Sequence, residues 1–244
     1  RDQDRCHESL SLQKKSLAML RRIHGSRDHR DVATSLGSLA KVYMDLGRLE
    51  KSAKLQEESV AMKRRVYGSR GHSDLAVSLC CLARVYELQH RLADATKLEE
   101  ESLSMNRRIH GSRDHSDVAA SMCSLARLYK GQDRLSESAK LQEEALSMKR
   151  RIHGSKGHNE VAASLHCLAQ VRMEQGRLDE AAKLAEESLM MLRRIQGSRP
   201  RDVTAALVNL VSVYEAQGRY DKVALLAKHL SGINLAAFMR SLVG

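Results

Sequence analysis

The side chains that could do chemistry in this 244-residue chain recur at a fixed interval. Four histidines lie 43 residues apart, at His29, His72, His115 and His158. Three of them follow a second histidine by five residues, at His24, His110 and His153. Paired imidazoles could hold Zn²⁺, but the spacing matches no known finger, and bonds of about 2.0–2.1 Å rule out an ion shared between repeats. We therefore expect the loop histidines to pack at or cap the next helix, and we predict no metal and no cofactor.

Acids and bases are equally repetitive, whereas an active site should interrupt a repeat at one place. The chain has no glycine-rich phosphate loop, no nucleophile elbow and no pair of carboxylates in a unique position. The sequence therefore predicts that the protein is not an enzyme.

Basic side chains form a series that we call the basic ridge. The 41 Lys and Arg residues exceed the 30 Asp and Glu residues, which gives a net charge of +11. Paired arginines end each second helical pattern, at Arg21, Arg22, Arg64, Arg65, Arg107, Arg108, Arg150, Arg151, Arg193 and Arg194. One interpretation is structural: cations at helix C-termini interact favourably with the helix dipole and stabilise the helix by roughly 0.3–1 kcal/mol each. The alternative is a docking edge for an acidic protein, an RNA or a membrane surface.

Aromatic residues make up only 3% of the chain, so the basic ridge has almost no rings on which bases could stack. Sequence-specific recognition of nucleic acid is therefore not expected.

The five cysteines have an odd number and no Cys-x-x-Cys spacing: Cys6, Cys80, Cys81, Cys123 and Cys167. This usage predicts reduced thiols and an intracellular, reducing compartment. The cytoplasm is the simplest choice. An organelle also fits, because the chain does not open with Met and a targeting segment could precede it.

The repeat that positions these residues is 43 residues long, as the glycines Gly25, Gly68, Gly111, Gly154 and Gly197 mark. Each unit holds two helical patterns with an apolar stripe, such as residues 31–46 and 49–66. A single helix hairpin cannot bury its apolar face, but stacked hairpins can. The single proline and the scarcity of aromatics also disfavour a β-sandwich. The sequence thus predicts an all-α solenoid of αα-hairpins.

We expect one solenoid over residues 1–244, as a fragment of a longer protein. Its parts are a truncated repeat's second helix at 1–24, repeats at 25–67, 68–110, 111–153 and 154–196, a last repeat at 197–230 and a capping helix at 231–244. No run of about 18 apolar residues exists, so no transmembrane segment is predicted.

Four segments resemble the tetratricopeptide repeat (TPR) family in its longer, kinesin light chain-like variety. They are His72-Ser-Asp-Leu-Ala, Leu79-Cys-Cys-Leu-Ala-Arg-Val-Tyr86, Ala145-Leu-Ser-Met and Gln217-Gly-Arg-Tyr220. The resemblance covers nearly the whole chain. It implies a right-handed superhelix whose first helices line a concave groove for peptide or protein partners, without catalysis. Of the paired asparagines that resemble a cargo clamp in kinesin light chains, only Asn209 is retained.

By this resemblance, the predicted groove residues are Lys41, Met44, Arg84, Glu87, Arg127, Lys130, His166, Gln170 and Asn209. Lys41, Arg84 and Arg127 are equivalent in three successive repeats. Adjacent helices pack about 8–10 Å apart, so these charges could follow an extended acidic ligand, or could simply be solvated surface charges.

The predicted function is therefore a non-enzymatic interaction scaffold that binds an acidic or extended peptide of a protein partner in the groove. One alternative is a kinesin light chain-like cargo adaptor. Another is a structural subunit of a large multiprotein assembly, and a third is non-specific RNA or polyanion binding through the basic ridge.

Overall fold

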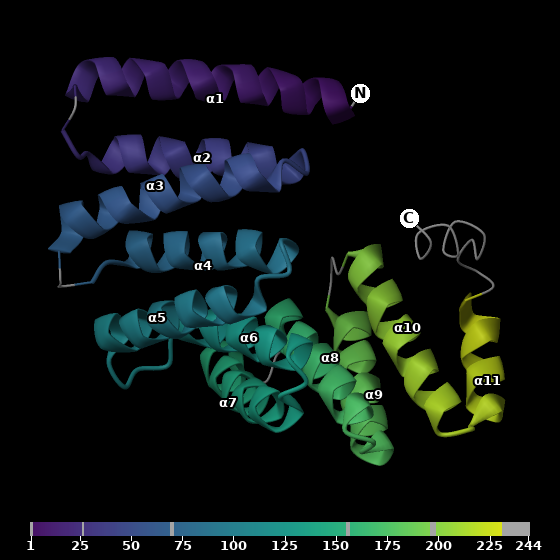
Figure 1. The fold of residues 1–244 in the computed structure, drawn as a ribbon. Helices are drawn as coiled ribbons and strands as arrows, with labels where there is room; N and C mark the ends of the chain where they lie inside the picture. The colour runs from purple at the N-terminus through teal and green to yellow at the C-terminus, as the bar shows by residue number, and fades with distance from the viewer. Residues whose placement is uncertain (1, 26, 69–70, 155–156, 196–198, 231–244) are drawn as a thin grey trace. The chain divides into compact units, whose positions relative to one another are not determined.

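The computed structural model of the chain describes residues 2–25, 27–68, 71–154, 157–195 and 199–230 (Figure 1). These residues form eleven α-helices and no strand. The helices are α1 (Asp2–His24), α2 (Arg30–Asp45), α3 (Leu49–Tyr67), α4 (Ser73–Leu88), α5 (Leu92–His110), α6 (Ser116–Gly131), α7 (Leu135–His153), α8 (Asn159–Glu174), α9 (Leu178–Arg194), α10 (Pro200–Ala216) and α11 (Tyr220–Leu230). The predicted all-α class of stacked helix hairpins is confirmed. The predicted capping helix at 231–244 lies outside the described residues.

The turn between the two helices of a hairpin keeps one backbone conformation in every described repeat. Gly47 has a φ of +69°, in the left-handed region that glycine adopts without a steric penalty. His90 and Asp133 take this place in two repeats and keep the same conformation, each with a φ of +60°. Since left-handed backbone costs a non-glycine residue roughly 1–2 kcal/mol, hairpin packing must hold these two turns in place.

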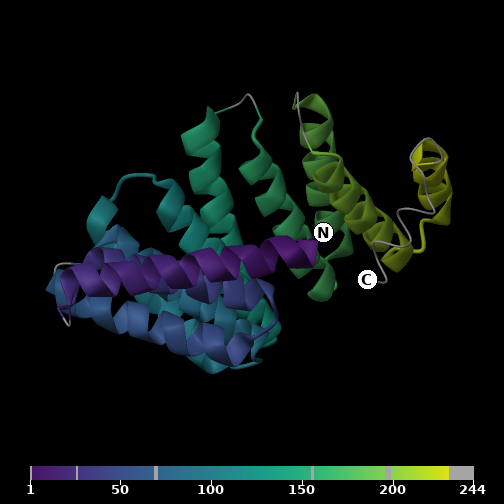
Figure 2. The same ribbon diagram turned by 90° about the horizontal axis from the view of Figure 1, so that it is seen from above.

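The helices divide into two compact units, residues 1–134 with α1–α6 and residues 135–244 with α7–α11. In the first unit each helix packs against the next, and the axes of α1 to α5 run one below another across Figure 1. Figure 2 shows α1 from above, lying over the helices that follow it. The interior contains fully buried leucines, such as Leu36 and Leu79, at the same position of successive repeats.

Buried serines allow the two helices of a hairpin to approach closely. Ser59 Oγ donates a hydrogen bond to the carbonyl of Ala33 at 2.6 Å, and Ser188 Oγ donates to Ala162 at 2.8 Å. Both serines are almost fully buried. The small residues that the sequence repeats on these faces thus serve close packing, with each hydroxyl satisfied by a backbone carbonyl.

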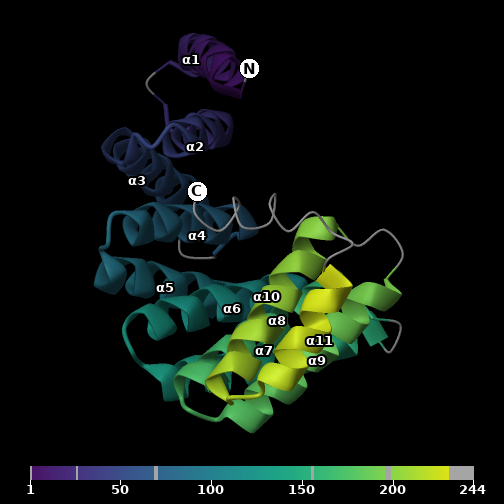
Figure 3. The same cartoon turned by 90° about the vertical axis from the view of Figure 1, so that its right-hand side faces the viewer.

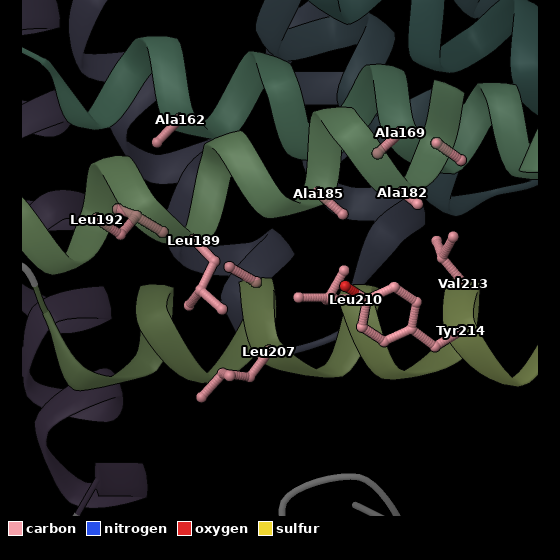
Figure 4. Packing of buried hydrophobic residues seen from close by; sticks show 12 residues of the cluster. Ala162, Ala169, Ala182, Ala185, Leu189, Leu192, Leu207, Leu210, Val213 and Tyr214 are labelled. Carbon is pink, nitrogen blue, oxygen red and sulfur yellow. The ribbon is translucent and has the colours of Figure 1, made fainter. Parts of the chain in front are cut away.

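In the second unit, α8, α9 and α10 surround one apolar cluster, and α11 lies beside α10 (Figure 3). Figure 4 shows Leu189 from α9 together with Leu210, Val213 and Tyr214 from α10. Alanines such as Ala185 face them, which brings the helix backbones close together.

The loop histidines cap the helices that follow, as predicted. In each, Nδ1 accepts a hydrogen bond of 3.1–3.2 Å from the backbone N–H two residues later; the four are His29, His72, His115 and His158. Each imidazole also stacks on the ring that ends the preceding helix, with centroids 3.4–4.0 Å apart; those rings are His24, Tyr67, His110 and His153. The stacking joins consecutive helices across a short loop.

Candidate functional site

A cavity of about 530 Å³ in the first unit is lined mainly by α2, α4 and α6, the first helices of three successive repeats, with side chains of α3 and α5 in its wall. The lining includes equivalent side chains from neighbouring helices: Thr34, Val77 and Ala120; Gly37 and Cys80; Lys41 and Arg84. Three of the predicted groove residues, Lys41, Met44 and Arg84, therefore lie on one hollow. The structure brings them together because a 43-residue step returns each first helix to the same orientation.

The residues that line this cavity include several with small or apolar side chains. Gly37 and Ala120 leave room for a ligand backbone, and Val77 is 59% exposed between them. A large aliphatic side chain so exposed on a helix that faces a cavity can contact a ligand's apolar group.

Polar side chains in the wall are engaged within the fold. Lys63 Nζ donates to Ser78 Oγ at 2.8 Å and to the Asp74 carbonyl at 3.2 Å, and burial lowers the pKa of this amine. Asn106 holds the equivalent position in the next repeat and donates to Ser121 Oγ at 2.9 Å. These contacts tie each second helix to the following first helix, so Lys63 serves the stacking of the repeats.

The three cations predicted to follow a ligand differ in their surroundings. Arg84 pairs with Glu87 at 2.7 Å, and Arg127 pairs with the other oxygen of the same carboxylate. Lys41 is exposed and belongs to none of the ion pairs among the described residues. Glu87 thus offsets two of the three charges, and Lys41 is left as the main attractive charge at this cavity.

Beside the cavity lies a buried acid that sequence reasoning did not select. Glu99 on α5 is 2% exposed, and the thiol of Cys80 donates to its Oε2 at 3.3 Å. Burial raises the pKa of Glu99 to about 7 and, together with the nearby carboxylate, raises that of Cys80 to about 12. A thiol with so high a pKa is a poor nucleophile, which agrees with a structural role for this cysteine.

The remaining predicted groove residues lie elsewhere. His166 lines a separate cavity of about 260 Å³ within the second unit. Asn209 is buried at 5% exposure, and its Nδ2 donates to the His166 carbonyl at 3.4 Å. Lys130 and Gln170 are partly buried on α6 and α8 and do not line either cavity. The structure therefore distributes the predicted set over two units.

All ten arginines of the basic ridge are exposed, and three of the first members are paired within the fold. Arg21 contacts Glu58 at 2.7 Å, Arg64 contacts Glu101 at 2.6 Å and Arg150 contacts Glu187 at 2.5 Å. Each ion pair joins the second helices of neighbouring repeats. This arrangement supports a structural role for these three arginines.

Three loops bring two imidazoles and one carboxylate within 4.8 Å of one another: His24, His29 and Asp31; His110, His115 and Asp117; and His153, His158 and Glu160. The paired rings are stacked within 10° of parallel, so their in-plane lone pairs do not converge on one point. Nδ1 of each capping histidine already accepts a backbone N–H. Ligation through this atom would break the helix cap, so the geometry fits capping better than metal binding.

None of the helices in the described ranges is both long and apolar enough to cross a lipid bilayer.

Comparison with known families identifies the repeat. The profile of MalT-like TPR regions matches residues 72–233, and a tetratricopeptide repeat profile matches residues 1–65 and 31–108. The chain belongs to the tetratricopeptide repeat family. This confirms the family to which the sequence motifs point, and proteins with this repeat are protein–protein interaction scaffolds in general.

Solved structures share the TPR fold. BtubC (BKLC) from P. vanneervenii is 20% identical with a TM-score of 0.81, covering 95% of this chain and 92% of its own. A Podosopora anserina protein described as a kinesin light chain with nearly identical TPR-like repeats is 24% identical with a TM-score of 0.73, covering 86% and 98%. The STAND signal-transduction ATPase with a tetratricopeptide repeat sensor from Pyrococcus horikoshii is 17% identical with a TM-score of 0.73, covering 91% of this chain and 33% of its own.

A comparison with curated proteins finds no match. The similarity to known proteins therefore supports the TPR fold and leaves the partner to be inferred from the surface.

Proposed function

We propose that this TPR protein is a non-enzymatic adaptor that binds an extended, acidic segment of a protein partner in the cavity of its first unit. The observation that carries the proposal is the cavity of about 530 Å³ that three successive first helices line at equivalent positions. A ligand that runs across α2, α4 and α6 would meet the same sequence of side-chain positions three times.

The chemistry of the cavity suggests which features the segment has. An apolar side chain of the ligand would contact Val77, and its backbone would approach Gly37 and Ala120. A carboxylate would bind Lys41, because this cation has no ion pair within the described residues. A second carboxylate would compete with Glu87 for Arg84, which makes that contact weaker. In such interfaces a few contacts provide most of the binding energy.

Charge reversal of Lys41, Arg84 and Arg127 to Glu tests the proposal. We expect loss of partner capture from lysate, measured by affinity purification and mass spectrometry, with helicity unchanged by circular dichroism. The matched control reverses Arg22, Arg193 and Arg194, which changes the net charge equally on the basic ridge. Capture should survive the control. Unaltered capture by the groove variant would show the proposal to be wrong.

A single substitution gives a second measurement of the same site. Glu87→Gln removes the carboxylate that offsets Arg84 and Arg127, so the affinity for a captured acidic partner should rise by about two- to fivefold. Isothermal titration calorimetry with the purified partner measures this change.

The alternatives predict other outcomes of the same experiments. Polyanion binding through the basic ridge predicts that the control variant loses capture, with a steep dependence on salt. A structural subunit would co-purify with a fixed set of neighbours that survives both charge reversals. A kinesin light chain-like adaptor would bring down motor components together with the acidic partner.

A further inference from the structure

One position on the second helices carries a charge in some repeats and none in others. It is Lys63 on α3, Asn106 on α5, Lys149 on α7 and Leu192 on α9. The first three donate to a serine of the following first helix, to Ser78 at 2.8 Å, Ser121 at 2.9 Å and Ser164 at 2.9 Å. Asparagine therefore makes this contact as well as lysine does, so the stacking of the repeats does not require a positive charge here.

The ammonium of Lys63 is buried, and it forms no ion pair within the part of the chain that the structure describes. Lys63 is 6% exposed, and its Nζ donates two hydrogen bonds, to Ser78 Oγ and to the backbone carbonyl of Asp74. The carboxylate of Asp74 instead accepts a hydrogen bond from Tyr67 at 2.8 Å. An ammonium has three N–H donors, so one of them is left for a ligand. Burial lowers the pKa of this amine, against the opposite effects of Asp74 and Cys81. Because a buried charge without a counter-ion is unfavourable, an anion that reached Lys63 would be bound strongly.

Lys63 lies in the wall of the groove cavity, as does Lys41. Both amines act electrostatically on the thiol of Cys81, which also lines the cavity. The acid in the lining is Asp117, whose carboxylate lies 3.5 Å from His110. Two cations thus lie around one thiol, Lys41 exposed on α2 and Lys63 buried on α3. An anion that entered the cavity past Lys41 could therefore reach Lys63.

We infer that Lys63 anchors the segment that binds in the groove, by donating a hydrogen bond from its ammonium to a side-chain carboxylate of that segment. Lys41 attracts the carboxylate at the surface of the cavity. Lys63 binds it inside, where the surrounding chain excludes water and a charge-assisted hydrogen bond is stronger than at the surface. This inference rests on the proposed function and adds which cation selects an acidic segment over a neutral one.

The test measures the binding of two octapeptides to the full chain by fluorescence anisotropy. Glu and Ala alternate in one peptide, Gln and Ala alternate in the other, and both have the same N-terminal dye and an amidated C-terminus. Eight extended residues span at most about 28 Å, which is enough to cross three helices that pack about 8–10 Å apart. We expect the native chain to bind the glutamate peptide about tenfold more tightly than the glutamine peptide.

Lys63→Asn removes the ammonium and introduces the residue that makes the same stacking contact at Asn106. It should weaken binding of the glutamate peptide by about tenfold, the loss expected for one hydrogen bond to a charged group, and leave binding of the glutamine peptide unchanged. Lys149→Asn is the matched control, because it makes the same substitution in the second unit. It should leave both affinities unchanged, and thermal denaturation reports whether each variant folds.

Asn106→Lys is a second variant that tests the same inference by a gain of binding. Asn106 lines the groove cavity, so the substitution adds an ammonium to its wall. Lys149 shows that a lysine fits at this position and donates to the serine of the following helix. The variant should bind the glutamate peptide more tightly than the native chain, by about two- to fivefold, and the glutamine peptide as before. This measurement keeps the inference testable if Lys63→Asn destabilises the chain.

Three results would overturn the inference. The first is that Lys63→Asn binds the glutamate peptide as tightly as the native chain while Lys41→Asn loses it, in which case the proposed groove function stands without this anchor. The second is that neither substitution changes the affinity, in which case the proposed groove fails together with the inference. The third is an equal loss in Lys149→Asn, which would indicate general attraction of an acidic peptide to a basic protein.

Discussion

The two units use the same repeat but leave very different spaces on their first helices. The first unit has a cavity of about 530 Å³, whereas the cavity beside His166 in the second unit has about 260 Å³. The equivalents of His166 in the first unit are small, Gly37 and Cys80 among them. In the second unit Asn209 also bonds to the His166 carbonyl. The imidazole of His166 therefore occupies space that the smaller side chains leave open at the equivalent positions of the first unit.

A second difference concerns the residue beneath the groove. Gln56 and Glu99 occupy equivalent positions of the first unit, and Gln142 and Ala185 take this position in the second. Gln56 Nε2 donates to the Ser78 carbonyl at 3.1 Å. An ionised Glu99 has no N–H or O–H with which to donate such a hydrogen bond, so the buried acid is less favourable than glutamine at this position.

The largest expected effect is that of Glu99→Gln. Burial raises the pKa of Glu99 to about 7, so between about pH 4.5 and pH 7 the folded chain holds a proton that the unfolded chain has released. The stability that this proton provides is fully present below pH 4.5 and is lost as the pH rises through 7. Chemical denaturation at pH 8 should show the variant more stable by up to about 3 kcal/mol, with a much smaller difference at pH 4.5.

The reciprocal change, Gln56→Glu, is the matched control. It places the same acid in a neighbouring repeat and should introduce a similar loss of stability above pH 7. Parallel pH profiles for Glu99→Gln and the native chain would contradict the assignment.

The next effect concerns a stripe of tyrosines on the first helices. Tyr86 and Tyr129 donate to glutamates 29 residues earlier, at 2.8 and 2.9 Å. In the second unit Arg172 occupies this position, is 8% exposed and pairs with the equivalent Glu143. Arg172 also donates to Gln175 at 2.7 Å. Arg172 thus makes the same contact with a glutamate as the tyrosines do, but through a charged donor.

Arg172→Ala should destabilise the chain by about 2 kcal/mol, because it removes a packed side chain and its bonds, while Glu143 remains half-exposed to water. Arg172→Tyr should stay within about 1 kcal/mol of the native chain, because the hydroxyl can reach the same glutamate. Urea denaturation measures both. If Arg172→Tyr destabilised the chain as much as Arg172→Ala, the side chains of the second unit would be packed specifically around the arginine.

The smallest effect is common to both units. His115 caps α6 in the first unit and His158 caps α8 in the second, each through Nδ1 at 3.2 Å. Replacing either by Ala should cost about 1 kcal/mol, because it removes one helix cap. Replacement by Asn, an alternative capping residue, should retain most of the stability that Ala loses, and thermal denaturation measures both variants. A much larger loss at one site would show that ring stacking there matters more than the cap.

Much of the fold could be predicted from the sequence because the interactions that define it are local. The helix boundaries and the histidine caps depend on residues within a few positions of each other, and the 43-residue period can be read directly from the sequence. The predicted helices at 31–46 and 49–66 agree with Arg30–Asp45 and Leu49–Tyr67 to within one residue at each end. Periodic apolar positions and glycine turns were sufficient signals for these features.

The site was harder to predict, because an ion pair such as that of Arg127 with Glu87 joins helices about one repeat apart. Lys41, Arg84 and Arg127 look alike in the sequence, but the structure gives Glu87 to two of them. Asn209 has the family's groove residue type and is nevertheless buried.

A stack of helix hairpins whose parts recur every 43 residues could be predicted from the residues alone, since backbone conformation follows from neighbouring residues. The pairing of the charges and the position of the cavities could be seen only in the folded chain. Those depend on the distance between side chains of neighbouring repeats and on their volumes.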